Sequence, residues 1–346
     1  PVLVSEPDLF LRLCPAPTVG VTGTKGKTTT AALAAHLLAG DPSHPVVLGG
    51  NIGTPLVDRL AGLTPGHRVV DELSELQLPS LSRGPTVGVY TNLTADHLDR
   101  HGSLESYRRV KRRLAELVDP EGALVLNLDD PVVGAYAALG ATPTVCYRLD
   151  RPIAGGLGIV DGWVVSAGVE RLPLAGGGVA ATGAGGRIMP LGELPLPGRH
   201  NVSNLLAATG VALLFGVAPD AIRGQAASFR GVEHRLELVA EIAGVRFVND
   251  SQGTQPDAVA AALRSFEAPL VLIAGGRDKG VDLAGLGPVA AERAAAAVLI
   301  GESGPALAAL FRAAGVARVE EAGTLGAALP RADAIARELL ATCPPG

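Results

Sequence analysis

The stretch Gly20-Val21-Thr22-Gly23-Thr24-Lys25-Gly26-Lys27-Thr28-Thr29-Thr30 decides the fold expected for this chain. It is a glycine-rich turn between an apolar strand and an Ala- and Leu-rich helix, the context in which a P-loop forms. The glycines let successive backbone N–H groups converge on an anion, and the helix N-terminus adds partial positive charge. Lys27 is placed to reach the terminal phosphates of a nucleotide, and the Thr28 hydroxyl to hold Mg²⁺. Because Val21 stands where the strict pattern has glycine, the motif is a variant. The alternative, a tight strand-to-helix connection without a ligand, is disfavoured by this context.

Composition limits the partners and the compartment of the chain. Its 346 residues predict two or three domains, and 47% hydrophobic residues suffice for more than one core. A net charge of −5 without a long basic run argues against nucleic acid or an anionic membrane as the main partner. Cys14, Cys146 and Cys343 form neither a metal motif nor a disulfide framework, so a cytoplasmic location is expected. Residues 205–218 are apolar but too few for a membrane span, and predict a buried helix.

Alternating strand and helix patterns predict an α/β fold with a mainly parallel sheet over residues 18–147. Ligands of such sheets gather beyond the carboxyl ends of the strands, where the polar motifs of this chain lie. The expected strands are 18–22, 46–48, 67–71, 86–91, 123–127 and 144–147, and the expected helices are 27–38 and 103–118.

A change in composition and periodicity along the chain predicts the remaining domain organisation. Residues 151–190 are glycine-rich without a helical period, which indicates a small β insertion packed on the first domain. A boundary near 229–235 precedes a second, Rossmann-like unit, which ends after a helix and is therefore expected to be incomplete. We predict a linker remnant at 1–17, a central nucleotide-binding domain at 18–230 and a C-terminal domain at 231–346. The second unit is expected to contain a hairpin at 237–242 and 245–250, strands at 270–274 and 297–300, and helices at 256–266, 284–295, 305–314 and 325–342.

Several polar clusters are ambiguous when taken singly. Glu72 follows a buried strand and suits a Mg²⁺ ligand opposite a P-loop threonine, but a solvated acidic turn is equally compatible. Lys111 lies four residues after Tyr107 on one helix face, where a solvated lysine is the simpler interpretation. The polar segments 91–101, 200–204, 234–235, 249–251 and 275–280 are each ordinary loop or turn chemistry.

Together, the order and number of these motifs resemble the Mur ligases of peptidoglycan synthesis over nearly the whole chain. Thr24-Lys25 and Asn249-Asp250-Ser251 favour the members that add D-glutamate, and the Asp-Asn-Pro-Arg signature of the diaminopimelate-adding relatives is absent. Folylpolyglutamate synthases share the central domain and are the nearest competing family. The motifs that carry the resemblance are 23–29, 50–53, 72–74, 96–100, Tyr107 with Lys111, 200–204, 234–235, 249–251 and 276–279.

The resemblance implies an ATP-dependent ligase. ATP phosphorylates the L-alanyl carboxylate of UDP-N-acetylmuramoyl-L-alanine, and the amine of D-glutamate attacks the resulting acyl phosphate, so that ADP and phosphate are released. Phosphorylation supplies the leaving group, and catalysis is chiefly positioning and charge neutralisation. The resemblance also implies two Mg²⁺ ions and a cytoplasmic, monomeric enzyme.

The resemblance further assigns roles to single residues. Lys27 and Thr28 would bind the terminal phosphates and the first Mg²⁺, with Glu72 as a ligand of that ion. His97 would bind a second Mg²⁺ together with Lys111, which carries a carbamate in this family; a carbamate turns an ammonium into an oxygen-donor anion. The remaining assignments are ATP contacts by Gly23, Thr24, Lys25, Gly26, Thr29, Asn204, Arg235 and Asp250, acceptor contacts by Asn51 and Ser74, and a contact of Lys279 with the carboxylate of the incoming amino acid.

The sequence departs from the family in two places and is expected to be shorter. Gln252 and Gln255 stand where Lys and Asn are usual, and Glu75-Leu76 replaces Ser-Phe. We expect the N-terminal uridine-binding domain and the end of the C-terminal domain to be missing, and therefore Mg·ATP binding with slow ligation. A non-catalytic or regulatory homologue that binds nucleotide and a partner chain is one alternative. A folylpolyglutamate synthase-type ligase is another, and acceptor specificity separates it.

Overall fold

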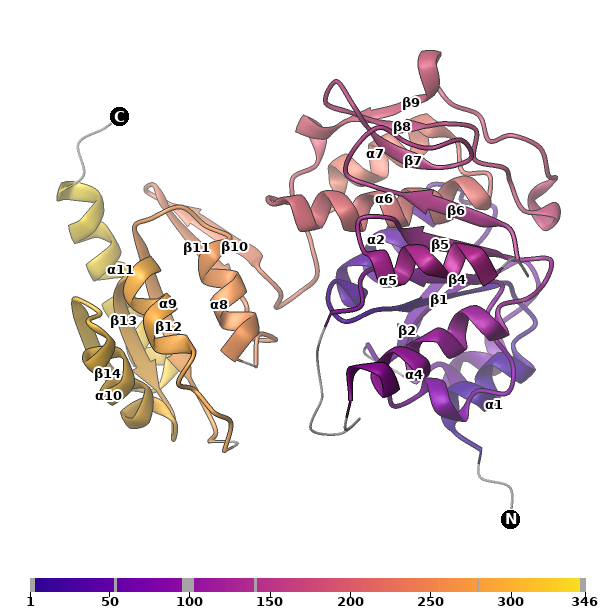
Figure 1. Ribbon diagram of the computed structural model, residues 1–346. Coiled ribbons are helices and arrows are strands. Elements are labelled where there is room, and N and C mark those ends of the chain that lie inside the picture. Colours follow the sequence, from indigo (N-terminus) through magenta and orange to yellow (C-terminus); the bar gives the residue numbers. More distant parts are fainter. Residues whose placement is uncertain are drawn as a thin grey trace. The chain divides into compact units, whose positions relative to one another are not determined.

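The computed structural model describes residues 4–52, 55–94, 103–139, 142–254, 256–278 and 280–342. The chain divides into two compact units, Pro1–Gly231 and Val232–Gly346 (Figure 1). Among the described residues, no helix has both the length and the apolar character needed to cross a bilayer.

The first unit is built on a nine-stranded sheet with the order β2-β3-β1-β4-β5-β6-β7-β8-β9. Every neighbouring pair from β2 to β7 is parallel, which confirms the predicted α/β class. All residues of β1, β3, β4 and β5 are buried, as expected for parallel strands covered on both faces. The strands of the parallel part are β1 (Thr18–Thr22), β2 (Val46–Gly50), β3 (Arg68–Glu72), β4 (Val87–Tyr90), β5 (Ala123–Asn127) and β6 (Thr144–Tyr147).

The glycine-rich region predicted as a β insertion adds strands to the same sheet. β7 (Leu157–Val160) pairs with β6 through Leu157 and Tyr147. β8 (Trp163–Ser166) and β9 (Arg187–Pro190) then follow in antiparallel pairing. The region therefore extends the sheet at one edge, whereas the sequence suggested a separate piece packed on the domain.

Helices cover both faces of the parallel part (Figure 1). Consecutive residues of a strand point to opposite faces, so Leu124 and Val125 of β5 identify the two sides. Leu124 belongs to the core formed with α4 (Leu104–Leu117) and α1 (Glu6–Leu13). Val125 faces α6 (Arg199–Leu214), where a Cβ added to Gly210 would lie 3.2 Å from its side chain. Helix α6 is buried from residue 204 to 214, as the apolar pattern predicted, and packs against α2 (Lys27–Leu38).

Helices α1, α5 (Pro131–Gly134) and α7 (Pro219–Ser228) were not among the predicted elements. Helix α1 has only eight residues, too few for a clear period, but it is well capped. The Ser5 hydroxyl accepts a hydrogen bond from the Asp8 N–H, and Pro7 stands in the first turn.

The second unit contains an antiparallel hairpin and a three-stranded parallel sheet. The hairpin joins β10 (Glu237–Ile242) to β11 (Val245–Asn249). The sheet has the order β12 (Leu270–Gly275), β13 (Ala294–Ile300) and β14 (Arg318–Gly323). One core forms against α8 (Pro256–Arg264), α9 (Leu286–Arg293) and α10 (Gly304–Ala314), and a second against α11 (Leu325–Thr342).

Strand β14 corrects the sequence interpretation, which passed directly from one helix at 305–314 to another at 325–342. Its sequence, Arg-Val-Glu-Glu-Ala-Gly, carries three charges and no apolar run. It forms at the edge of the sheet, where one flank and part of its faces meet solvent and charged side chains are tolerated.

Candidate nucleotide site

The glycine-rich loop runs from the end of β1 to the first residue of α2, as the sequence predicted. Gly26 has a φ of +84° and Gly23 a φ of +150°, both in the region that favours glycine. A Cβ on Gly23 would lie 1.9 Å from Thr91 Oγ1, and a Cβ on Gly26 would lie 2.6 Å from Asn204 Oδ1. The loop therefore needs both glycines, for its backbone angles and for its neighbours.

The end of β4 holds the loop in this shape. The Thr24 N–H donates to the Asn92 carbonyl at 2.8 Å, and the Lys25 N–H donates to Asn92 Oδ1 at 3.0 Å. The Lys25 carbonyl accepts from Thr91 Oγ1 at 2.7 Å and from Asn92 Nδ2 at 2.9 Å. Sequence reasoning placed Thr91 and Asn92 in a polar loop without a role. Their position directly after a buried strand neighbouring β1 was the available signal.

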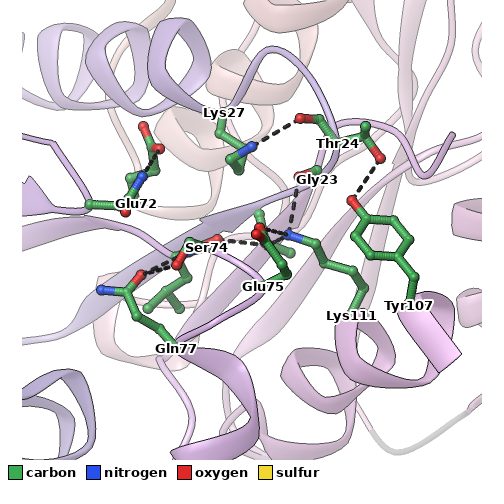
Figure 2. Close-up of polar contacts among 12 residues, drawn as sticks. Gly23, Thr24, Lys27, Glu72, Ser74, Glu75, Gln77, Tyr107 and Lys111 are labelled. Carbon is green, nitrogen blue, oxygen red and sulfur yellow. Dashed lines mark hydrogen bonds and ion pairs between the residues drawn. The ribbon is translucent and has the colours of Figure 1, made fainter. Parts of the chain in front are cut away.

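Lys27 opens α2 with a partly exposed side chain, and its ammonium donates to the Thr24 carbonyl at 2.9 Å (Figure 2). Thr28 and Thr29 follow it in the first turn. The Thr24 hydroxyl lies 2.9 Å from the Tyr107 hydroxyl of α4. The loop thus presents a lysine and a helix N-terminus, the elements that stabilise a polyphosphate.

Glu72 stands beside the loop because β3 is the parallel neighbour of β1, with Glu72 in register with Val21. It is 2% exposed, so the solvated-turn interpretation of Glu72 is wrong. Its Oε1 accepts from Asn51 Nδ2 at 3.0 Å, while its Oε2 is buried and has no hydrogen-bond partner among the described residues. A buried carboxylate oxygen of this kind suits a hard cation.

Two further residues of the Glu72 segment differ in what surrounds them. Ser74 turns its N–H and its hydroxyl to Gln77 Oε1, at 2.8 and 2.9 Å. Asp71 is 1% exposed, and both of its carboxyl oxygens lack hydrogen-bond partners within the described part of the chain. Burial, with the charges of Glu6 and Glu72, raises the pKa of Asp71 well above its usual range. Sequence reasoning did not single out Asp71.

Lys111 is completely buried, so the interpretation as a solvated lysine is wrong. Its ammonium donates to Thr22 Oγ1 and to the Gly23 carbonyl, each at 3.1 Å. Glu75 Oε2 lies 3.9 Å from the same nitrogen (Figure 2). The lysine therefore reaches from α4 to the end of β1, directly beneath the glycine-rich loop.

Asn204, the residue of α6 predicted as an ATP contact, lies beside the loop. Its Oδ1 accepts from the Thr30 hydroxyl at 3.1 Å, and its Nδ2 donates to Asn201 Oδ1 at 3.3 Å. Asn201 in turn donates to the Pro197 carbonyl at 2.7 Å. These bonds fix an amide beside the first turn of α2.

The other predicted residues lie in the second unit or outside the described residues. Arg235 and Asp250 are neighbours within the second unit, where the Leu236 N–H donates to Asp250 Oδ1 at 3.1 Å. Burial raises the pKa of Asp250, and that hydrogen bond and the Arg235 charge oppose the shift. His97, Lys279 and Gln255 lie outside the described residues.

The positions of the lysines in the sequence also point to these motifs. Only four of the 29 Lys and Arg residues are lysine, and they are Lys25, Lys27, Lys111 and Lys279. All four belong to the motifs discussed above, whereas arginine supplies the positive charge everywhere else. Lysine offers a compact ammonium with rotatable donors, which a planar guanidinium does not replace.

Two protein families match the chain along most of its length. The Mur ligase middle domain matches residues 21–212, and the family described as Mur ligase, glutamate ligase domain, matches residues 234–343. The UDP-N-acetylmuramoylalanine–D-glutamate ligase of Acetivibrio thermocellus is 38% identical over 303 residues, which are 88% of this chain and 62% of the relative. The corresponding ligase of Roseiflexus sp. is 40% identical over 308 residues, which are 85% of this chain and 63% of the relative.

Solved structures agree in fold. MurF from Acinetobacter baumannii superposes with a TM-score of 0.66 at 19% identity, covering 95% of this chain and 72% of that one. A pseudomurein peptide ligase type C from Methanothermus fervidus gives a TM-score of 0.57 at 20% identity, covering 95% and 74%. The chain spans 62–63% of the length of the two sequence relatives named above.

Proposed function

Since this chain belongs to the Mur ligase family, we propose that it carries the ATP-dependent part of a ligase that joins D-glutamate to UDP-N-acetylmuramoyl-L-alanine in peptidoglycan precursor synthesis. The reaction passes through an acyl phosphate and releases ADP and phosphate. The relatives named as D-glutamate ligases support this choice of substrates, since they match 85–88% of the chain at 38–40% identity.

One observation carries the proposal: the P-loop lysine and a buried carboxylate follow or end neighbouring parallel strands at the same edge of the sheet. Lys27 follows β1, and Glu72 ends β3, which pairs with β1 along its length. Phosphoryl transfer needs positive charge at the phosphates and a cation held by oxygen ligands from more than one element. Lys27, Thr28 and Glu72 provide these groups at the carboxyl edge of the sheet, where such folds bind ligands.

The residues divide the work between binding and orientation. Lys27 and the N–H groups of the first turn of α2 bind the phosphates, and Thr91 and Asn92 keep the loop shaped for them. Asn204 sits beside the loop as an ATP contact, and we assign Arg235 and Asp250 to the nucleotide as well. Asn51, which donates to Glu72, and Ser74 face the acceptor, and Lys279 receives the carboxylate of the amino acid.

Mg²⁺ fits the residues described here. Glu72 Oε2 is a buried acceptor without a hydrogen-bond partner among the described residues, and we propose the Thr28 hydroxyl, in the first turn of α2, as a second ligand. When bound, the ion neutralises the charge that develops on the transferring phosphoryl group. We propose His97 as a ligand of a second ion.

The carbamate that the resemblance implies for Lys111 does not fit these surroundings well. The nitrogen already donates to two acceptors and faces Glu75. No step of the proposed reaction is therefore assigned to a carbamate. We further propose a monomer that works in the cytoplasm, a location with which the unpaired thiols of Cys14 and Cys146 are compatible.

Coupled phosphate release tests the proposal. We expect release from Mg·ATP that requires both UDP-N-acetylmuramoyl-L-alanine and D-glutamate, and that Lys27→Ala abolishes. Arg223→Ala is the matched control, since it removes an exposed positive charge of the same unit that forms an ion pair with the surface residue Glu193. Nucleotide binding without acceptor-dependent release would favour the regulatory homologue. Release driven by a folate acceptor would favour the folylpolyglutamate synthase-type ligase.

A further inference from the structure

Lys111 and Glu75 form a buried ion pair beneath the glycine-rich loop. Lys111 lies on α4 and Glu75 follows β3, and their side chains are 0% and 9% exposed. Their charged atoms, Nζ and Oε2, are 3.9 Å apart (Figure 2). Glu75 is also the residue at which this sequence departs from the serine usual in the family.

The hydrogen bonds of Lys111 show how many N–H groups its nitrogen must carry. The Thr22 hydroxyl donates its own hydrogen to the Leu73 carbonyl at 2.8 Å, so towards Lys111 it can only accept. The Gly23 carbonyl can only accept as well. Two acceptors among the described residues therefore take hydrogen bonds from one nitrogen, and the Glu75 carboxylate adds an ion pair at 3.9 Å. An ammonium, with three N–H groups, can satisfy both acceptors. Carbamylation joins that nitrogen to the carbon of CO₂ and releases protons, leaving a single N–H.

The negative charge of Glu75 also disfavours a carbamate on Lys111. A carbamate would place a second anion next to the buried Glu75 carboxylate, and two like charges in a buried site disfavour each other. Serine at position 75 brings no such charge. An ammonium instead leaves the site with a paired cation and anion, the arrangement in which buried charges are tolerated.

We propose that Lys111 remains an unmodified ammonium in this protein, and that Glu75 is the residue that prevents its carbamylation. Glu75 then provides, as a side chain of the protein, the negative charge that faces the Lys111 nitrogen. Lys111 acts as a positioning residue, because it ties the Gly23 carbonyl to α4. The inference about the state of Lys111 is independent of the reaction; only the relevance of its charge to Mg·ATP rests on the proposed function.

Carbon-13 NMR of the 346-residue chain in ¹³C-bicarbonate tests the inference directly. The chain has only four lysines, so a carbamate on Lys111 is identified as a signal that Lys111→Ala removes. We expect no such signal in the wild-type protein, with or without Mg·ATP. Glu75→Ser should produce it. Glu75→Gln, which keeps the size and removes the charge, should produce it too if charge is the cause.

The outcomes separate the parts of the inference. A Lys111-dependent signal in the wild-type protein overturns it outright. A silent wild type with a silent, folded Glu75→Ser variant overturns the role of Glu75, and the fluorescence of Trp163 in the same unit monitors that fold. Glu193→Gln is the matched control, a partly exposed surface carboxylate whose removal should leave the spectrum unchanged. ATP binding measured by calorimetry on the same samples reports on the proposed function separately, since a failure to bind ATP leaves the NMR result intact.

Discussion

A double-mutant cycle on Lys111 and Glu75 gives the sharpest measure of the buried pair. Opposite charges 3.9 Å apart attract by about 4 kcal/mol at an effective dielectric constant of about 20, before the cost of removing both from water. We expect Lys111→Met to lower the free energy of unfolding by about 3–5 kcal/mol, because it leaves the Glu75 carboxylate and the Gly23 carbonyl buried without their donor. Glu75→Gln should cost less, about 2 kcal/mol, because the ammonium keeps two acceptors.

The double variant should cost less than the sum of the single variants, with a coupling free energy of about 1–3 kcal/mol. Urea unfolding followed by the fluorescence of Trp163 is the suitable assay. Trp163 is the only tryptophan of the chain and lies in the unit that contains the pair, so the second unit does not contribute to the signal. The surface pair Arg223–Glu193 is the control, and its coupling should be much smaller because water and salt screen exposed charges.

The sign of the coupling free energy distinguishes an ammonium from a carbamate on Lys111. An ammonium opposite a carboxylate gives attractive coupling, whereas a carbamate opposite a carboxylate gives repulsive coupling. A value below about 0.5 kcal/mol, or a repulsive one, would refute the reasoning from donors and charges.

Three further predictions concern the loop and its neighbours. Lys27→Ala should weaken Mg·ATP binding at least about tenfold in calorimetry with little change in the urea midpoint, since a partly exposed lysine stabilises phosphate charge rather than the core; normal binding would contradict the P-loop assignment. Gly23→Ala should lower the free energy of unfolding by about 3 kcal/mol, because its Cβ meets Thr91 Oγ1 at 1.9 Å, whereas Gly62→Ala, with open space around it, should be nearly neutral. Asp71 has a raised pKa in the folded state, so it favours folding below the unfolded pKa near 3.8 and loses that contribution as pH rises through the folded pKa. In metal-free protein Asp71→Asn should therefore flatten this decline, measured as unfolding free energy between pH 4 and 8, and a slope equal to the wild type would sink the assignment.

Local patterns were sufficient for the elements that surround the loop. The strand 18–22 and the helix 27–38 were predicted with the bounds that the structure gives, because a β-branched run, a glycine-rich turn and an Ala-rich helix agree with one another. Strand β14 was missed for the opposite reason: its charges hide an edge strand whose pairing depends on β13. The β7–β9 region was predicted as strands, but its continuity with the sheet rests on one bridge between Tyr147 and Leu157.

In the candidate site, too, residues within one motif could be predicted from the sequence, whereas contacts between distant segments could not. Gly23, Gly26 and Lys27 follow from their immediate sequence. The contact between Glu75 and Lys111 could not be deduced, since 36 positions separate the two residues. They meet because α4 packs against the segment Leu78–Ser80, which follows Glu75 closely. Asp71 was overlooked because a strand-end aspartate normally meets water, whereas here β1 and β2 flank it on both sides.

The scarcity of lysine makes this protein chemically addressable. Reagents that acylate primary amines can react with only four lysine side chains. Among the described ones, solvent exposure decreases from the exposed Lys25 through the partly exposed Lys27 to the buried Lys111. Apart from the α-amino group, amine-directed immobilisation or dye labelling of the first unit would therefore attach at the glycine-rich loop and block it. Conversely, the extent of acylation, read by mass spectrometry, would serve as a footprint of nucleotide occupancy without any engineered probe.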